Sequence, residues 1–405
     1  MIFTKLWPNS FQTMFPKTMK TKNQTAGTRA LGLVLGALML GPVPLGAQSF
    51  DVGSNGSLGD VVISENTTLD LPADGKLHYK SLTVDSGVRL NFKRNIRNTP
   101  VVILSQGDVV VNGTIDVSGG DGTTTSGGVP GPGGFGGGQP GFGTTSPGEG
   151  YGPGGGALGN VGTCNFTFRN GNGSFGSGGN SARSGATYGN TFLIPLIGGS
   201  GGAGGTGSPG TGGSGGGGAV LVASNTKVTV SGALVAQGGI DNGCGGGGGS
   251  GGAIRLVALR VEGKGLLDAR SRGSGGLGRI RVDTLERDGI AFNFQGVSSV
   301  GGNLFSLPTS IPRLDTIEVA GTAFPEGSQP GTILLPFGST PERTVKIQAR
   351  DFGKVVPVRL TLTPDTGAKV VVDAEVDNST VNPAVVEVPV TFPVNAKVTV
   401  HCWTR

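Results

Sequence analysis

The sequence is poor in the residues on which most enzymes and metal sites depend. Its 405 residues include only two histidines, His78 and His401, which stand in unrelated segments. A histidine-dependent catalytic triad or a histidine-rich metal site is therefore not expected. The sequence also lacks a CxxC pair, an HExxH motif and a glycine loop that ends in Lys-Ser or Lys-Thr. These absences argue against a zinc site, a zinc protease and a nucleotide-phosphate loop, so we expect no metal and no cofactor.

Cysteine is scarce, and the number of cysteines is odd. Cys164 and Cys244 lie in two glycine-rich stretches and are candidates for one disulfide, which would leave Cys402 free or intermolecular. Three unpaired thiols are the open alternative, because spacing alone does not select a pairing.

No stretch beyond the first 47 residues is apolar enough to span a bilayer, which takes roughly 20 apolar residues. The first 47 residues themselves have the order of a secretory signal peptide. A basic leader ends at Arg29, an apolar core covers Ala30–Leu40, and small residues precede a cleavage site near Ala47. The leader is more ordinary if translation starts at Met19 instead of Met1. We expect a secreted, extracellular or cell-surface protein.

A charge imbalance is also missing once this leader is set aside. The whole chain has 31 basic and 26 acidic residues, and the leader contains five of the basic ones and none of the acidic ones. The remaining chain is therefore close to neutral. It has no field of one sign that would favour nucleic acid or an anionic membrane.

Glycine is what the sequence has in excess, with 81 residues, of which 42 fall between Gly119 and Gly218. From Gly198 to Gly218 glycine opens seven consecutive triplets. A period of three is that of the polyproline II helix. The pattern predicts an ordered bundle of polyglycine II strands, and a flexible glycine-serine linker is the alternative.

The glycine-rich stretches interrupt a repeated unit of strand character. Val101–Gly120 aligns without a gap with Val220–Gly239, a third copy covers Ala253–Ser271, and a degraded fourth begins within Gly278–Gly289. Each copy alternates apolar and polar residues, so one face is apolar and needs a neighbouring copy to cover it. This predicts an all-β fold with a right-handed-type parallel β-helix. A hairpin-built β-sandwich is the rival, but Asn112-Gly113 is the one hairpin-type dipeptide at a suitable spacing.

The C-terminal part has a different texture. Seven short alternating segments follow one another within residues 311–405, separated by proline and glycine. This predicts an immunoglobulin-like β-sandwich, although the segment has neither an internal cysteine pair nor a tryptophan in its middle.

Two groups of side chains are candidates for function. Asp116 and Asp268 occupy the same position of the repeat with Val235 between them, which predicts a separation of roughly 10 Å, near the upper end for paired carboxylates in inverting glycosidases. The alternative is that both carboxylates only solubilise the surface. Candidate ligand-binding aromatics in and near the glycine-rich window are Phe135, Phe142, Tyr151, Phe168 and Tyr188. The alternative for the aromatics is that they fill the joint between the bundle and the β-helix.

The repeat, the returns of the type GGGGSGGAIRL and the leader resemble bacterial secreted glycine-rich β-helix proteins, many of them adhesin-like. The triplet run resembles the polyglycine II bundles of phage adhesins and springtail antifreeze proteins. We expect a structural or adhesive protein that binds a glycan, a cell-envelope component or copies of itself. An extracellular polysaccharide lyase or glycoside hydrolase is the alternative, and ice binding is a third.

The predicted domains are 1–47, signal peptide; 48–120, β-helix; 121–218, glycine-rich insertion; 219–300, β-helix with a short insertion at 240–252; and 311–405, sandwich.

Overall fold

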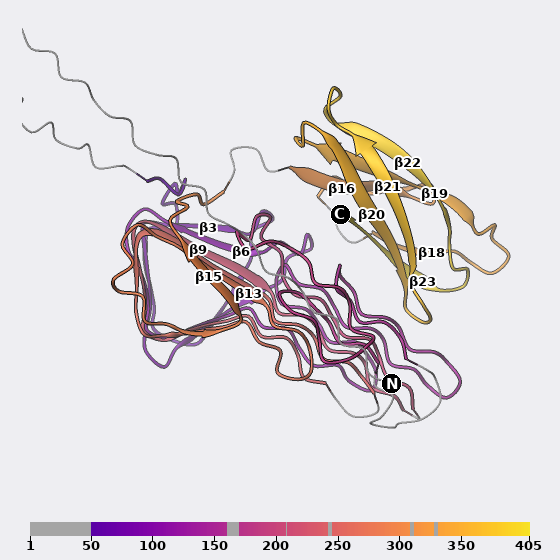
Figure 1. Cartoon of the computed structure of the whole chain (residues 1–405), viewed down its shortest axis with the longest axis horizontal. Helices are drawn as coiled ribbons and strands as arrows, with labels where there is room; N and C mark the ends of the chain where they lie inside the picture. The colour runs from indigo at the N-terminus through magenta and orange to yellow at the C-terminus, as the bar shows by residue number, and fades with distance from the viewer. Residues whose placement is uncertain (1–49, 160–169, 208, 242–244, 308–311, 328–330) are drawn as a thin grey trace, which may run out of the picture. The chain divides into compact units, whose positions relative to one another are not determined.

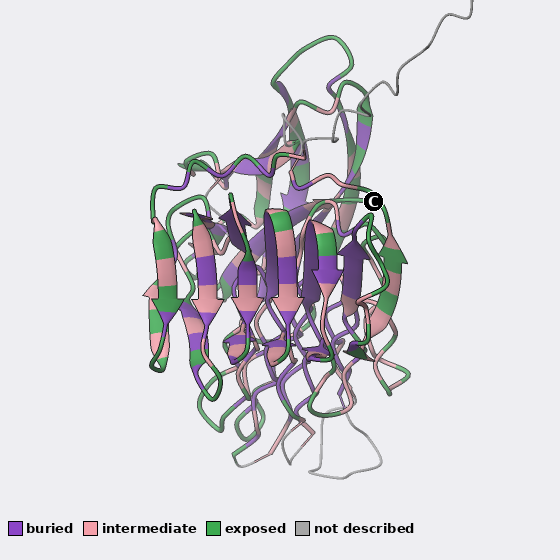
Figure 2. Ribbon diagram, turned by 90° about the vertical axis from the view of Figure 1, so that its left-hand side faces the viewer, coloured by how far each residue is buried: buried purple, intermediate pink, exposed green. Residues whose placement is uncertain are grey.

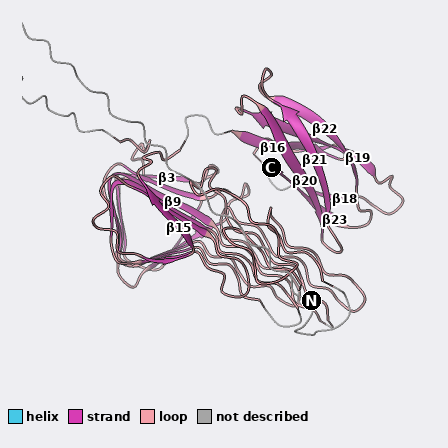
Figure 3. Ribbon diagram, viewed as in Figure 1, coloured by secondary structure: helices cyan, strands magenta, loops and turns pink. Residues whose placement is uncertain are grey.

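A computed structural model describes residues 50–405 except 160–169, 208, 242–244, 308–311 and 328–330. The predicted signal peptide, Cys164, Cys244 and Phe168 therefore lie outside the described residues. The described part is all-β and contains no helix, which confirms the all-β part of the predicted fold class (Figure 3). Residues Ser49–Arg405 belong to one unit. No helix among the described residues has the length and hydropathy of a membrane span.

Two parallel sheets make up the repeated part of the chain (Figure 1). The chain passes repeatedly from one sheet to the other, since β7 leads into β8, β9 into β10, and β11 into β12, while β3 and β4, and likewise β6 and β7, follow one another within the larger sheet. The nine-stranded sheet contains β1 (Asp60–Ile63), β3 (Lys76–Tyr79), β4 (Ser81–Val84), β6 (Val101–Ser105), β7 (Val109–Val111), β9 (Ala219–Val230), β11 (Ala253–Glu262), β13 (Arg279–Asp283) and β15 (Val297–Gly301). The six-stranded sheet contains β2 (Thr67–Asp70), β5 (Arg89–Lys93), β8 (Thr114–Asp116), β10 (Ala233–Val235), β12 (Leu266–Asp268) and β14 (Asn293–Gln295).

The register of these strands is the one that the sequence alignment predicts. Val109 pairs with Val228, and Ile115 pairs with Leu234, which in turn pairs with Leu267. The dipeptide Asn112-Gly113 does not form a hairpin, since β7 pairs with β4 and β9 while β8 pairs with β5 and β10. The hairpin-built alternative for this region is therefore wrong. Parallel stacking covers the apolar face of each copy by joining it to a core that continues into the next copy.

The inward-facing apolar residues of both parallel sheets share one core, while Val102, Leu104 and Leu221 of the larger sheet belong to a separate cluster. Alternation along each strand sends every second side chain inward, and Figure 2 shows the resulting alternation of buried and less buried segments along neighbouring strands. Fully buried members include Val109, Val228, Ile115, Leu234 and Leu267. Valine, leucine and isoleucine suit these positions because β-branched and aliphatic side chains pack well on a pleated surface.

The C-terminal part forms two antiparallel four-stranded sheets around a second core. All seven predicted segments are strands, and the two-residue β17 follows the first of them. The strands are β16 (Arg313–Val319), β17 (Thr322–Ala323), β18 (Gly331–Leu334), β19 (Glu342–Arg350), β20 (Val355–Pro364), β21 (Val370–Asp377), β22 (Ala384–Thr391) and β23 (Lys397–Thr404). Their sheet orders are β17-β16-β19-β22 and β18-β23-β20-β21.

Candidate functional site: the glycine-rich bundle and the polar sheet face

The two glycine-rich stretches lie side by side. We call their described residues, within 119–218 and 237–252, the glycine-rich bundle. The amide of Ser214 in the long stretch donates to the carbonyl of Gly247 in the short one at 2.9 Å, and the amide of Gly173 donates to Gly248 at 2.9 Å. Figure 1 shows the bundle as strand-free segments that run alongside one another. Backbone hydrogen bonds between segments therefore hold together a region without regular strands.

The hydrogen bonds of the triplet run repeat every three residues. Within 198–205, successive amides donate to different neighbouring segments, and every third amide from Gly199 donates to the segment 211–217. The amides of Gly199, Gly202 and Gly205 donate to the carbonyls of Gly217, Ser214 and Thr211 at 2.7–2.9 Å. Those of Gly201 and Gly204 donate to Tyr151 and Gly148, and that of Ala203 donates to Gly171, at 2.8–3.0 Å. A segment with this period is surrounded by backbone on several sides, unlike a sheet strand, which has neighbours on two sides.

Close approach of neighbouring backbones explains why the bundle is made of glycine. A Cβ atom placed on Gly213 would collide with the carbonyl group of Gly202, and one on Gly137 would collide with the carbonyl group of Gly213. Relief at either place would require backbone to move, which is costly in a closely packed interior. The glycine content is thus a packing requirement of the bundle.

Two of the candidate aromatics, Phe135 and Tyr151, pack on strand β23. The Phe135 ring centroid lies 5.7 Å from that of His401 and 6.4 Å from that of Trp403, both edge-on. The Tyr151 ring lies 6.0 Å from His401. Burial raises the pKa of Tyr151 and lowers the pKa of His401 to about 4. These rings join the bundle to the C-terminal sheets, so neither is a freely presented anchor.

Tyr188 lies instead where the bundle meets the nine-stranded sheet. Its ring is 4.7 Å from the fully buried Phe175, in a cluster that includes Ala219 at the start of β9 and Ala253 at the start of β11. Its hydroxyl donates to the carbonyl of Gly198 at 2.6 Å and accepts from Ser200 at 2.9 Å. Burial raises the Tyr188 pKa. This is the joint-filling role that the sequence left open as the alternative.

Phe142 remains as the exposed member of the described aromatic candidates, with 69% of its surface accessible. It lies at a turn of the bundle, where it pairs with Thr145 in an isolated bridge. The remaining cysteine, Cys402, is free and buried, and burial raises the pKa of its thiol. Its burial conflicts with an intermolecular disulfide, which would need the sulfur to be accessible.

The structure places Asp116 and Asp268 on opposite sides of Val235 in the six-stranded sheet, as predicted. Each carboxylate is bound by an arginine of its own. Asp116 pairs with Arg89 and accepts from the amide of Ser118 at 2.8 Å.

Asp268 is 1% exposed and accepts from Arg270 Nη2 at 2.8 Å and from Gln237 Nε2 at 2.7 Å. Burial alone would raise the pKa of Asp268, but its hydrogen bonds to Arg270 and Gln237 and the charge of Arg270 outweigh burial and lower it. The carboxylate therefore stays ionised at neutral pH, whereas a general acid needs a raised pKa.

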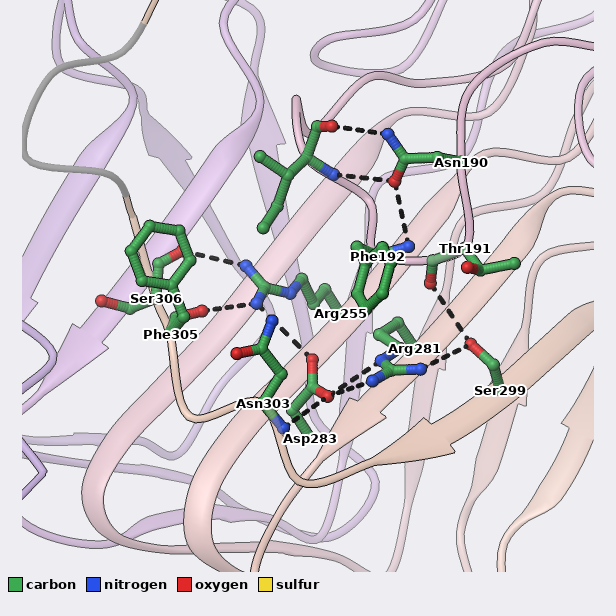
Figure 4. A network of polar contacts seen from close by, with 11 residues as sticks. Asn190, Thr191, Phe192, Arg255, Arg281, Asp283, Ser299, Asn303, Phe305 and Ser306 are labelled. Atoms are coloured by element: carbon green, nitrogen blue, oxygen red, sulfur yellow. Dashed lines mark hydrogen bonds and ion pairs between the residues drawn. The ribbon is translucent and has the colours of Figure 1, made fainter.

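A buried ionic network that sequence reasoning missed lies at the last copies of the repeat (Figure 4). Arg281 donates to Asp283 Oδ1 through Nε at 2.9 Å, and Arg255 Nη2 lies 3.5 Å from Asp283 Oδ2. Arg255 Nη1 also donates to the carbonyl of Ser306 at 2.9 Å. Arg255 and Asp283 are 2% and 0% exposed. The network fastens the segment that follows β15 onto β11 and β13. Its sequence signal was an arginine at one register position of two copies, since Arg255 pairs with Arg281.

Within the described ranges, no group of three or more His, Cys, Asp or Glu side chains is placed to hold a metal ion. Comparison of the chain with protein-family models, curated proteins and solved structures found no match.

Proposed function

We propose that this chain is an exported scaffold protein that binds a glycan or another component of the cell envelope, or copies of itself, without turning over its ligand. The single observation that supports this best is the three-residue period of backbone hydrogen bonds in the glycine-rich bundle. About half of the glycines lie in this region, where backbone amides bind backbone carbonyls and many residues have no side chain. Such a region supplies a rigid body and few catalytic groups.

The finer architecture is part of the same proposal. The two parallel sheets share a core, and the chain passes repeatedly between them; this supports a right-handed-type parallel β-helix. The three-residue period and the buried glycines support polyglycine II packing in the bundle. Two antiparallel sheets around one core support an immunoglobulin-like sandwich at the C-terminus. The proposed export is based on the leader within residues 1–47. The same leader, together with the repeat, is the basis of the resemblance to adhesin-like surface proteins.

The polysaccharide lyase or glycoside hydrolase alternative has no support from the two aspartates. Each is engaged by an arginine, and the Asp268 pKa is shifted away from that of a general acid. The experiment that tests the proposal incubates purified residues 48–405 with a panel of neutral and acidic polysaccharides and measures both retention and product release. We expect retention of at least one polymer without release of reducing ends or unsaturated products. Turnover that disappears in Asp116→Asn or Asp268→Asn would overturn the proposal.

A further inference from the structure

The outward side of the six-stranded sheet carries one aligned row of side chains. Register places Thr68, Asn91, Asp116, Val235, Asp268 and Gln295 next to one another across the six strands. Their neighbours along each strand, such as Ile115, Leu234 and Leu267, point into the core. Because side chains alternate faces along a strand, the row faces away from the core. We call this row and its parallel neighbours Arg89, Thr114, Ala233, Leu266 and Asn293 the ladder face.

The polar side chains of the ladder face are connected across four strands. Asp116 binds Arg89 and the amide of Ser118, whose hydroxyl accepts from the amide of Gln237 at 3.1 Å. Gln237 in turn donates from Nε2 to Asp268, which binds Arg270. The Arg89 and Arg270 side chains are 52% and 47% exposed at the two ends of this connection. Two guanidinium groups are therefore held in place by carboxylates and still reach solvent, which lowers the entropy lost when they bind a ligand.

The ladder face is electrically balanced. The charged residues of its strands, together with Arg270, form three ion pairs, namely Arg89–Asp116, Lys93–Asp70 and Arg270–Asp268. A polyanion would gain no net attraction from such a face, because every cation is already neutralised. An uncharged ligand with many hydroxyl groups suits this face better. Hydroxyls both donate and accept hydrogen bonds, so they can bind the donor and acceptor sites that carboxylates, amides and guanidinium groups do not use in their ion pairs.

The centre of the ladder face is small and apolar. Ala233 and Val235 of β10 lie between Thr114 and Asp116 of β8 on one side and Leu266 and Asp268 of β12 on the other. A sugar ring has an apolar face of C–H groups and a rim of hydroxyls. Val235 can pack against the ring face while the exposed guanidinium groups of Arg89 and Arg270 bind the rim.

The spacing of the strands favours a chain of sugars over a single one. Neighbouring strands lie about 4.8 Å apart, which is comparable with the advance of one sugar unit in an extended polysaccharide. We infer that the ladder face is a binding site for an extended, uncharged polysaccharide that runs across the strands, with Val235 at its centre. This inference rests on the proposed function and names its ligand class and its surface.

The test compares two lysine substitutions at matched outward positions. Val235→Lys places a long charged side chain in the middle of the ladder face. Thr229→Lys places the same side chain on β9, between the buried Val228 and Val230, on the outward side of the other sheet. Calorimetry measures binding of uncharged hexasaccharides of glucose, mannose and xylose, shorter oligomers of the same sugars, and a polyuronate. Circular dichroism and the unfolding midpoint verify that both variants fold.

We expect affinity for one uncharged series to rise with oligomer length, to fall at least tenfold in Val235→Lys and to persist in Thr229→Lys. Binding that persists in folded Val235→Lys would overturn the ladder face while leaving the proposed function intact. Preference for the polyuronate would also overturn it, since it contradicts the charge argument. If the unsubstituted protein binds no glycan, no envelope preparation and no second copy of the chain, the proposed function itself fails.

Discussion

The imidazole of His401 lies 5.7 Å from the Phe135 ring, so a strand of the C-terminal sheets buries its only histidine against the glycine-rich bundle. The ring is packed between Phe135, Tyr151 and Trp403, and its Nδ1 atom has no hydrogen-bond partner. A charged imidazole is poorly tolerated there, which is why its pKa falls to about 4.

Acid should therefore weaken the fold through His401. The unfolded chain takes up this proton near pH 6.5, whereas the folded chain resists it until about pH 4, so stability is lost as the pH falls between these values. The difference between the two pKa values corresponds to a loss of about 3 kcal/mol in the free energy of unfolding across that pH window. Urea unfolding at pH 7 and pH 4.5 measures the loss. His401→Phe keeps a ring without a titrating group, so its stability should change less with pH; equal pH dependence of both proteins would contradict the assignment.

Substitution of a buried bundle glycine should be costly even by one methyl group. Gly213→Ala drives a Cβ atom into the backbone of Gly202, and we expect a loss of about 1–3 kcal/mol in the free energy of unfolding. Gly178 is the matched control in the same bundle, because a Cβ atom there meets nothing within 4 Å. Gly178→Ala should leave the urea midpoint nearly unchanged. If both alanines are tolerated equally, the bundle is not closely packed.

Loss of Asp283 should leave two arginines without their buried partner. Asp283→Ala is expected to destabilise the protein by about 3–5 kcal/mol, because the uncompensated charges of Arg255 and Arg281 would remain on side chains that are 2% and 8% exposed. Thermal and urea unfolding measure the change. Asp373→Asn removes the exposed pair with Arg359 and should have little effect. A mild effect of Asp283→Ala would mean that water or segment 302–307 rearranges to cover the arginines.

Thiol labelling tests the placement of Cys402. In a Cys164→Ser/Cys244→Ser background, a thiol reagent should label the folded protein slowly and the unfolded protein at once, because burial restricts access and raises the pKa of the Cys402 thiol. Mass spectrometry after a short pulse measures both rates. In the unsubstituted chain, the same reagent in denaturant distinguishes one free thiol, as the predicted Cys164–Cys244 disulfide requires, from three.

Much of the parallel part of the fold could be predicted from local pattern. The pairing of Val109 with Val228 and of Ile115 with Leu234 follows from alternation and from a glycine at a constant place in each copy. A slip by one residue would turn every apolar side chain outward, so the pattern specifies the register strongly. The seven predicted C-terminal strands also follow from the sequence, because each alternates and the connections between them contain glycine or proline.

The candidate site was predictable only in part. The alignment of Asp116 with Asp268 follows from the repeat, but their arginine partners come from different places, Arg89 from β5 and Arg270 from two residues downstream of Asp268. The aromatics illustrate the same limit. Nothing in the local sequence of Phe135 or Tyr151 indicates His401, about 250 residues away, as the neighbour of both.

The sequence by itself determined the period of each region, two in the strands and three in the glycine triplets, because a period depends only on how a chain turns from one residue to the next. The tertiary structure decided which segments became neighbours. It placed Gly202 against Gly213 and Arg255 against Asp283, and it brought the Tyr188 hydroxyl to the carbonyl of Gly198. Those choices depend on excluded volume and on the pairing of buried polar groups, which exist only once distant segments pack together.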